Sequence, residues 1–245
     1  MNIKYLCILL FLIGITSSSN AEQLVVTEIL PPYQFYQENN VLNGFSVEVM
    51  DEIFKITDDD IDLRVLPWAR AYKTAINQAN TLIFSLSRTL LREDSFIWGG
   101  KLMTEDVYAW GLKEKFQTPI TNIKQLRKYK IAVTNSSSTA QHFQQQQYPY
   151  LHVLGSPEQS LQMLYINRVD IITGTKNTLT ARASELNLDI TKLKKMISLS
   201  AVNHDLYFAF SLNSDEEIVT KYMDAYKTIK NNGILDKLKN KWQVK

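Results

Sequence analysis

Two serines and one arginine follow a short apolar run in the first half of the chain. The run 81–84 is typical of a buried strand, Ser85 and Ser87 alternate at its end, and Arg92 comes five residues after Ser87. A guanidinium can bind both oxygens of a carboxylate, and serine hydroxyls can donate to the remaining lone pairs. The stretch therefore indicates half of a carboxylate-binding site, although serine is also common in turns and an arginine after a strand is commonly solvated.

A second group of hydroxyls lies at a predicted strand-to-helix junction. The segment 130–133 is β-branched and apolar, and Ser137, Ser138 and Thr139 follow it where a helix is expected to begin. Free N–H groups and the positive end of a helix favour an anion there without any basic side chain. One of the three hydroxyls is expected to cap the helix in the ordinary way, which leaves two for a ligand.

The charge of the chain is nearly balanced, with 27 Lys and Arg against 25 Asp and Glu. A nucleic-acid-binding protein needs a dense basic face, so the balance argues against that class. The locally basic stretch 221–245 is expected to be a solvated helical face, with docking to a partner as the alternative. The three histidines show no metal-ligand spacing, and no glycine-rich phosphate loop occurs, so we expect neither a metal nor a cofactor.

The first 21 residues have the composition of a cleaved secretory signal peptide. A positive start at 1–4 precedes an apolar run at 5–15, and Ser19-Asn20-Ala21 is a plausible cleavage site before Glu22. The apolar run is shorter than the ~20 residues that span a bilayer. The chain's one cysteine, Cys7, lies in this segment, so the mature chain is expected to be exported to the periplasm without disulfides.

Strand and helix patterns alternate along the rest of the chain, which indicates an α/β protein. Ser156, Pro157 and Gln159 together mark one helix start, by a cap, a first-turn proline and a capping-box glutamine. The expected strands are 23–27, 61–66, 82–84, 107–112, 130–133, 152–154, 168–173 and 206–211. The other expected helices are 45–56, 68–77, 123–129, 176–187, 215–230 and 234–242.

Several short motifs occur in a recognisable order along the mature chain. They are an aromatic loop after Pro31-Pro32, Gly44-Phe45-Ser46-Val47-Glu48, Trp68, Ser85-Leu86-Ser87 with Arg92-Glu93, Arg168-Val169-Asp170, and Gly233-Ile234-Leu235-Asp236-Lys237-Leu238 with Lys241-Trp242. In this order the sequence resembles the periplasmic solute-binding proteins that serve polar amino acid importers, bacterial solute-binding family 3. The string Pro67-Trp68-Ala69-Arg70-Ala71-Tyr72 resembles a divergent branch of that family.

The resemblance implies the type II periplasmic binding fold, a clamp of two lobes with two mixed sheets flanked by helices. Residues 22–110 and 206–245 would form the first lobe, and residues 111–205 the inserted second lobe. Two crossing strands, near 107–112 and 205–211, would form the hinge, and the lobes would close on a ligand in the cleft.

The resemblance also implies which residues contact the ligand. Its carboxylate would be held from both lobes, and its other side by aromatic walls at Tyr33 and Trp68. Core packing is the alternative for both rings. Trp68 directly follows Pro67 at the end of a predicted strand, which favours a position in the ligand pocket over one in the core. The carboxylate-binding residues implied are Ser85, Ser87, Arg92, Ser137, Ser138 and Thr139.

One departure from the family pattern concerns the ammonium end of the ligand. Amino acid binders of this family usually place an Asp after the strand of the second lobe, and the corresponding residue here is Thr175. A buried ammonium without a charged partner is costly. Glu28, directly after the first strand, could substitute or could be a solvated loop residue. Arg70 could add a cation to the pocket or could lie on the helix surface.

Three functions are compatible with these residues. The first is a monomeric, non-enzymatic protein that captures a small carboxylate-bearing solute, an amino acid or a relative, for the permease of an ABC importer. The second is an exported enzyme on the same fold, similar to cyclohexadienyl dehydratase, with Glu28 as its acid or base. The third is a sensory module that presents its solute to a membrane receptor.

Overall fold

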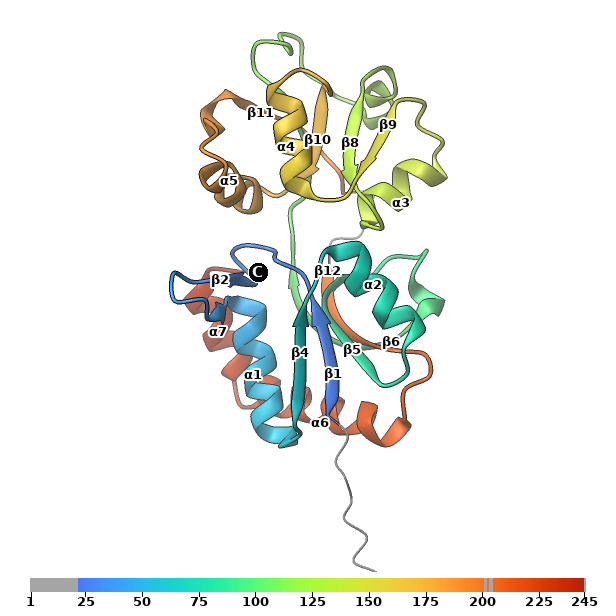
Figure 1. Ribbon diagram of the computed structural model, residues 1–245, viewed down its shortest axis with the longest axis vertical. Coiled ribbons are helices and arrows are strands. Elements are labelled where there is room, and N and C mark those ends of the chain that lie inside the picture. The colour runs from blue at the N-terminus through green and yellow to red at the C-terminus, as the bar shows by residue number, and fades with distance from the viewer. Residues whose placement is uncertain (1–21, 201, 203–204, 245) are drawn as a thin grey trace, which may run out of the picture.

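The computed structural model describes residues 22–200, 202 and 205–244, and the expected signal peptide, 1–21, lies outside the described residues. Figure 1 shows two bodies of mixed strands and helices stacked along the long axis of the molecule. Each body is built on its own five-stranded sheet. We call the body that holds the first strand the first lobe, and the other the second lobe. None of the described helices is long and apolar enough to cross a membrane.

The first lobe is a mixed sheet in the order β4-β1-β5-β12-β6. β1 runs parallel to β4 and β5, whereas β12 runs antiparallel to β5 and β6. Its strands are β1 (Gln23–Thr27), β4 (Ile61–Val65), β5 (Thr81–Ser87), β6 (Phe96–Thr104) and β12 (Asp205–Ser211), with a small hairpin of β2 (Phe35–Tyr36) and β3 (Leu42–Asn43). Its helices are α1 (Phe45–Thr57), α2 (Trp68–Asn77), α6 (Glu216–Asn231), α7 (Ile234–Trp242) and the short 3-10 turn η1 (Glu93–Ser95).

Apolar residues on α1, α6 and α7 cover one face of this sheet, and those on α2 cover the other. Phe45, Val49 and Ile53 recur at helical spacing on α1 and are fully buried, as their periodicity predicts. They belong to the same core as Phe208 and Phe210 of β12. This core fixes β1 and β5, so the chain that leaves their carboxyl ends is held in place.

The second lobe is a mixed sheet in the order β11-β7-β10-β8-β9. Alternate residues of its strands face two cores, with η2 and α3 on one face and α4 and α5 on the other. Its strands are β7 (Tyr108–Leu112), β8 (Ile131–Thr134), β9 (Leu151–Leu154), β10 (Ile171–Gly174) and β11 (Leu193–Ser198). Its helices are η2 (Ile123–Lys128), α3 (Ser138–Gln145), α4 (Pro157–Tyr165), α5 (Lys176–Glu185) and η3 (Ile190–Lys192).

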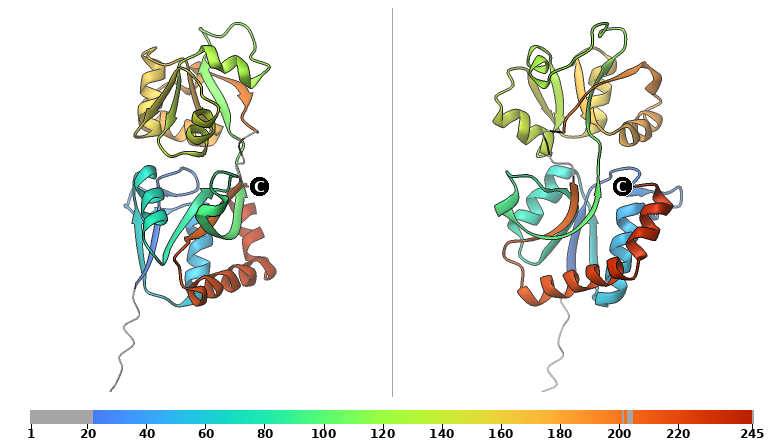
Figure 2. Two further views of the ribbon diagram at one scale, coloured as in Figure 1. Left: turned by 90° about the vertical axis from the view of Figure 1, so that its right-hand side faces the viewer. Right: turned by 180° about the vertical axis from the view of Figure 1, so that it is seen from behind.

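Two connections join the lobes, one between β6 and β7 and one between β11 and β12 (Figure 2). The strands expected to cross the hinge each lie in a single sheet, β7 in the second lobe and β12 in the first. A boundary between residues 110 and 111 would cut β7, whose hydrogen bonds to β10 and β11 tie it to the second lobe. We therefore propose that the lobes divide between β6 and β7 and between β11 and β12.

Two helix starts in the second lobe have the caps that their sequences predict. Ser156 accepts a hydrogen bond from the backbone N–H of Gln159, and Pro157 occupies the first helical position of α4. Ser137 accepts one from the N–H of Ala140 and so caps α3. The cap leaves Ser138 and Thr139 on the first turn of α3, at the edge of the second lobe that faces the first.

Gly44, at the start of α1, has a backbone that a side chain would disturb. Its φ is +130°, and a Cβ there would lie 2.3 Å from the Tyr33 carbonyl oxygen. We expect Gly44→Ala to lower the free energy of unfolding by about 2–3 kcal/mol, from strain and displacement of the Tyr33 loop. Urea unfolding measures it. Gly233→Ala is the matched control, because its φ is +71° with no atom within 4 Å of the added Cβ. Equal losses in the two variants would contradict the steric account.

Candidate functional site

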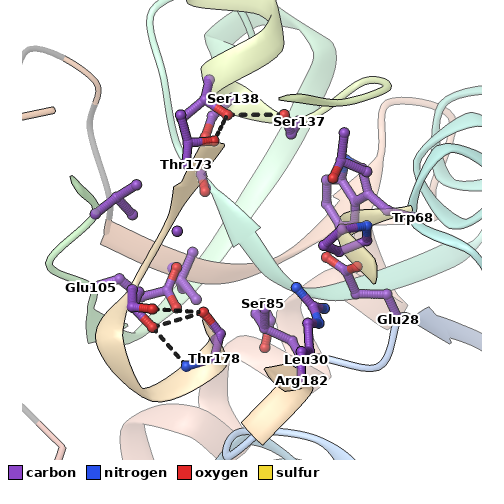
Figure 3. Close-up of a pocket in the computed structure, with 18 of the residues that line it drawn as sticks. Glu28, Leu30, Trp68, Ser85, Glu105, Ser137, Ser138, Thr173, Thr178 and Arg182 are labelled. Carbon is purple, nitrogen blue, oxygen red and sulfur yellow. Dashed lines mark hydrogen bonds between the residues drawn. The ribbon is translucent and has the colours of Figure 1, made fainter. Parts of the chain in front are cut away.

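A cavity of about 120 Å³ lies between the two lobes. β1 and β5 are parallel, so Glu28 and Ser87 meet at the same edge of the first sheet, where ligands of open α/β sheets bind. The first turns of α3 and α5 face them from the second lobe (Figure 3). The expected site residues that line this cavity are Glu28, Trp68, Ser85, Ser87, Arg92, Ser137, Ser138, Thr139 and Thr175.

Two expected site residues, Tyr33 and Arg70, do not line this cavity. Tyr33 is 5% exposed and packs in the core of the first lobe, because its loop folds back so that its carbonyl accepts the N–H of Ser46. It is not a wall of the cavity. Arg70 lies on the exposed face of α2, since Trp68 and Ala71 occupy the buried face of that helix. Of the two alternatives for Arg70, a cation in the cavity or a residue on the helix surface, the structure has the second.

Arg92 is fully buried, and its guanidinium bridges the two lobes. Its Nε donates to Gln141 Oε1 at 2.9 Å and one Nη to the Ser136 carbonyl at 2.8 Å, both in the second lobe. The other Nη donates to the Ser87 carbonyl at 3.0 Å in its own lobe. Burial lowers the pKa of Arg92 to about 10, so the side chain stays charged at neutral pH.

Two cross-lobe hydrogen bonds meet at the Ser136 carbonyl oxygen. It accepts from Trp68 Nε1 at 2.9 Å as well as from Arg92. The Arg92 guanidinium also lies 5.6 Å from the centre of the Trp68 ring and 4.9 Å from that of Tyr72, within cation–π range. These contacts hold the lobes together at one end of the cavity, so the clamp is closed in this structure.

Arg182 makes a second connection between the lobes from the other side. It lies on α5, is 5% exposed, and donates to the Ile29 carbonyl oxygen at 2.9 Å. Its Nε is 3.0 Å from Glu158 Oε1, so it is ion-paired within the second lobe. Arg182 therefore brings a second buried guanidinium to the cavity wall, opposite the α3 end.

Ser85 lies in a β-bulge of β5. Ile83 pairs with Ala209 and Leu86 with Tyr207, so two residues of β5 oppose one of β12. The φ of Ser85 is +59°, and its Oγ lies 2.9 Å from both Gln34 Oε1 and Ser46 Oγ. The bulge turns Ser85 toward the cavity, while its hydroxyl is anchored within the first lobe.

The hydroxyls of the second lobe form a short chain at the α3 end. Ser137 Oγ is 3.1 Å from Thr139 Oγ1, which is 3.2 Å from Thr173 Oγ1 on β10. Ser138 lines the cavity beside them. Thr175 caps α5 by accepting the N–H of Thr178 at 3.1 Å. Thr175 thus supplies a helix cap and no negative charge to the cavity.

Two carboxylates line the cavity, Glu28 after β1 and Glu105 after β6. Burial raises the pKa of Glu28 to about 7, against the opposing effect of Arg182 and Arg92. Burial raises the pKa of Glu105 to about 8, with Glu28 adding to the rise and Arg182 opposing it. Both carboxyls are therefore largely or partly protonated at neutral pH when the cavity holds no cation.

Sequence reasoning missed three functional side chains at the cavity or its closure, Glu105, Gln141 and Arg182. Glu105 follows a strand whose pattern is broken by two glycines, and Gln141 lies in a short, mostly polar helix whose composition is typical of a solvated surface. Arg182 lies on a helix of low amphipathicity, so no apolar stripe marks its buried face. No residue pattern in a single sequence distinguishes these side chains from surface ones.

A second hollow of about 330 Å³ adjoins the cavity and shares Glu28, Trp68, Pro157 and Arg182 with it. Leu66 and Pro67 extend its apolar wall. The two hollows together suit a small solute with a polar head and a less polar extension. Among residues 22–200, 202 and 205–244, no group of three or more His, Cys, Asp or Glu is placed to hold a metal ion.

The family model for bacterial extracellular solute-binding proteins, family 3, matches residues 23–245. The chain belongs to this family. No curated protein sequence matches it. Family 3 thus accounts for the whole described chain, which agrees with the resemblance carried by its motifs.

Solved structures share the two-lobed fold at low sequence identity. A histidine kinase sensor domain similar to periplasmic binding proteins has a TM-score of 0.78 at 16% identity, covering 91% of this chain and 96% of that chain. An ancestral arginine-binding protein bound to arginine has a TM-score of 0.75 at 17% identity, covering 91% and 99%. The GluR0 ligand-binding core of Nostoc punctiforme, in complex with L-glutamate, has a TM-score of 0.71 at 20% identity, covering 90% and 98%. At these identities the likeness establishes the fold.

Proposed function

We propose that this protein captures a small carboxylate-bearing solute, an amino acid or a relative, in the interlobe cavity and delivers it to an ABC importer. The observation that carries the proposal is a cavity between two lobes whose walls hold both charge signs. Arg92 and Arg182 supply positive charge, and Glu28 and Glu105 supply carboxyls. A zwitterion is the solute class that satisfies both.

The carboxylate of the solute is expected at the α3 end of the cavity. The N-terminal turn of α3 offers free N–H groups and the Ser138 hydroxyl there. Besides its hydrogen bonds to Gln141, Ser87 and Ser136, Arg92 also bonds to the Tyr72 side chain, so one of its five N–H donors remains for an anion. Two charge-assisted hydrogen bonds at ~1.5–3 kcal/mol each, with stacking on Trp68, support micromolar binding, about −8 kcal/mol.

A calorimetric and thermal-shift screen of amino acids, dipeptides, polyamines and organic acids tests this proposal. At a ligand concentration ~100 times Kd, binding adds ~2.7 kcal/mol of stability, which raises the Tm of a protein of this size by several degrees. We expect at least one amino acid to bind the wild type. Arg92→Lys should weaken binding of that amino acid at least tenfold, because an ammonium cannot replace the planar, bidentate guanidinium. Binding by no member of the screen would overturn the proposal.

Export and partnership belong to the same proposal. The expected signal peptide would deliver the chain to the periplasm, where a closed, loaded clamp could dock on a permease. A membrane receptor is the alternative partner, and the described lobes would serve either one. Co-purification of the protein with a permease or with a receptor from detergent-solubilised membranes distinguishes the two.

An exported enzyme on the same fold is the second candidate, and the raised pKa of Glu28 favours it. A buried carboxyl with a pKa of about 7 on the wall of a cavity is matched to proton transfer at neutral pH. Such an enzyme would resemble cyclohexadienyl dehydratase. Turnover of prephenate or arogenate by the purified protein, lost in Glu28→Gln, would establish this activity, and the absence of turnover would exclude it.

A further inference from the structure

Glu105 lies on the connection between the lobes and faces the cavity. It sits between Thr104, which ends β6, and Tyr108, which begins β7. Its side chain lines the interlobe cavity, whereas that of its neighbour Asp106 lines a separate hollow with Tyr33 and Lys176. Glu105 is thus the connector residue whose carboxyl reaches the ligand space.

One oxygen of this carboxyl, Oε1, is enclosed by protein and has no hydrogen-bond partner among the described residues. Figure 3 shows Glu105 beside Thr178, on the side of the cavity opposite Glu28 and Trp68. The Thr175 and Thr178 hydroxyls lie 2.9 Å apart and bond to each other. A buried carboxylate oxygen without a donor is costly, so such a group calls for a partner that the protein itself does not supply.

The two carboxyls that line the cavity, Glu28 and Glu105, differ in the charged side chains around them. Beside the effect of burial, Arg182 and Arg92 lower the pKa of Glu28 and Glu158 raises it, whereas for Glu105 only Arg182 lowers the pKa and Glu28 raises it. Glu105 is therefore the carboxyl of the cavity with less positive charge near it, and its oxygen Oε1 has no partner among the described residues. A positively charged N–H donor placed there would satisfy Oε1 and balance this charge.

We propose that Glu105 is the ammonium-binding residue of the cavity, so that the solute carries a protonated amine as well as a carboxylate. This inference rests on the proposed solute-binding function and specifies its chemistry. Thr175, which occupies the usual aspartate position, is engaged as the cap of α5. Glu105 supplies the missing negative charge from the connector, so the amine is held at the segment that links the lobes.

Matched pairs of solutes that differ only in the α-amine test the proposal by calorimetry. The probes are L-arginine with 5-guanidinopentanoate, L-glutamine with 4-carbamoylbutanoate, and L-phenylalanine with 3-phenylpropanoate. We expect the wild type to bind the amine-bearing member of a pair at least tenfold more tightly. Glu105→Gln should weaken that member about 10- to 100-fold and change binding of its deaminated partner by less than about threefold. Asp106→Asn, the neighbouring carboxylate outside this cavity, should leave both unchanged.

The outcomes separate this inference from the function on which it rests. If the amine-bearing and deaminated members bind equally well, or if Glu105→Gln weakens both members equally, the amine site is overturned while solute binding stands. If the wild type binds neither member of any pair, this inference is overturned, and the broader screen decides whether solute binding stands.

The ligand-free protein provides a readout that needs no probe. Because Glu105 is buried and ionised at pH 9 with only Arg182 opposing the rise in its pKa, Glu105→Gln should raise the Tm at pH 9 by about 2–4 °C, as expected from relief of a poorly compensated buried charge. A lower Tm for Glu105→Gln would show that the carboxylate is a structural ion-pair member, and would overturn the assignment.

Discussion

Replacement of Arg92 by alanine is expected to lower the free energy of unfolding by about 3–5 kcal/mol and to abolish solute binding. The side chain is fully buried, so its loss leaves space in the interior. It also removes donors from the Ser87 and Ser136 carbonyls and positive charge from beside Glu28. Urea unfolding followed by tryptophan fluorescence measures the first effect, and calorimetry the second.

The same substitution should open the clamp, because two of the bonds that cross between the lobes come from Arg92. Small-angle X-ray scattering should record a larger radius of gyration for Arg92→Ala than for the wild type. Arg70→Ala is the control, since Arg70 lies exposed on the same lobe, and it should change stability by less than about 0.5 kcal/mol. Equal stability and equal dimensions for the two variants would contradict the bridging role of Arg92.

The ligand-free protein is expected to lose stability as the pH rises from about 5 to about 8. The pKa values of Glu28 and Glu105 are raised by burial from the ordinary 4.5 to about 7 and about 8. Between 4.5 and these values the folded chain binds more protons than the unfolded chain, so raising the pH favours unfolding. Each pKa unit corresponds to about 1.4 kcal/mol, so both groups together contribute several kcal/mol at most.

Urea unfolding at pH 5, 7 and 9 measures this dependence. The double variant Glu28→Gln/Glu105→Gln should show a flatter profile, with its advantage over the wild type appearing at pH 7 and growing at pH 9. Binding of an amine should release protons near pH 7, which calorimetry in buffers of different ionisation enthalpy detects. A wild-type stability that rises over this pH window, or a double variant with an unchanged profile, would contradict the raised pKa values.

Much of the fold could be predicted from periodicity and caps. The apolar stripe of α1, the cap of α4 and the apolar run of β5 are local signals, and each lies where the sequence indicates. β6 was not predicted as a strand, because Gly99 and Gly100 interrupt it. Both glycines lie against large rings, and a Cβ would approach Phe208 to 2.2 Å at Gly99 and Tyr226 to 2.4 Å at Gly100. That packing involves residues more than a hundred positions away, which the local pattern cannot reveal.

β11 was also missed, for a different physical reason. It is an edge strand with Lys194 and Lys195 in its middle, a composition that protects an exposed edge from pairing with other chains. Such a segment lacks the apolar alternation by which strands are recognised. Hydrogen bonding to β7, rather than strand propensity, forms it.

The candidate site was predictable where its residues leave strand ends or begin helices. The order of the motifs predicted that Ser85, Arg92 and Ser137 contact one ligand, and all three residues line the same cavity. Glu105 and Arg182 could not be predicted, because their burial depends on how the second lobe faces the first. The position of Tyr33 could not be predicted for the same reason, since the fold of its loop, and not its residue type, places the ring in the core of the first lobe.

A crystal structure of the wild type with the tightest-binding amino acid of the calorimetric screen tests the central claim most directly. We expect density for the amino acid in the interlobe cavity, with its carboxylate within ~2.7–3.2 Å of donors from the α3 N-terminus or Arg92. Its amine should lie at a similar distance from Glu105. An amino acid bound outside this cavity, or held with no contact to Arg92, Glu105 or α3, would contradict the account.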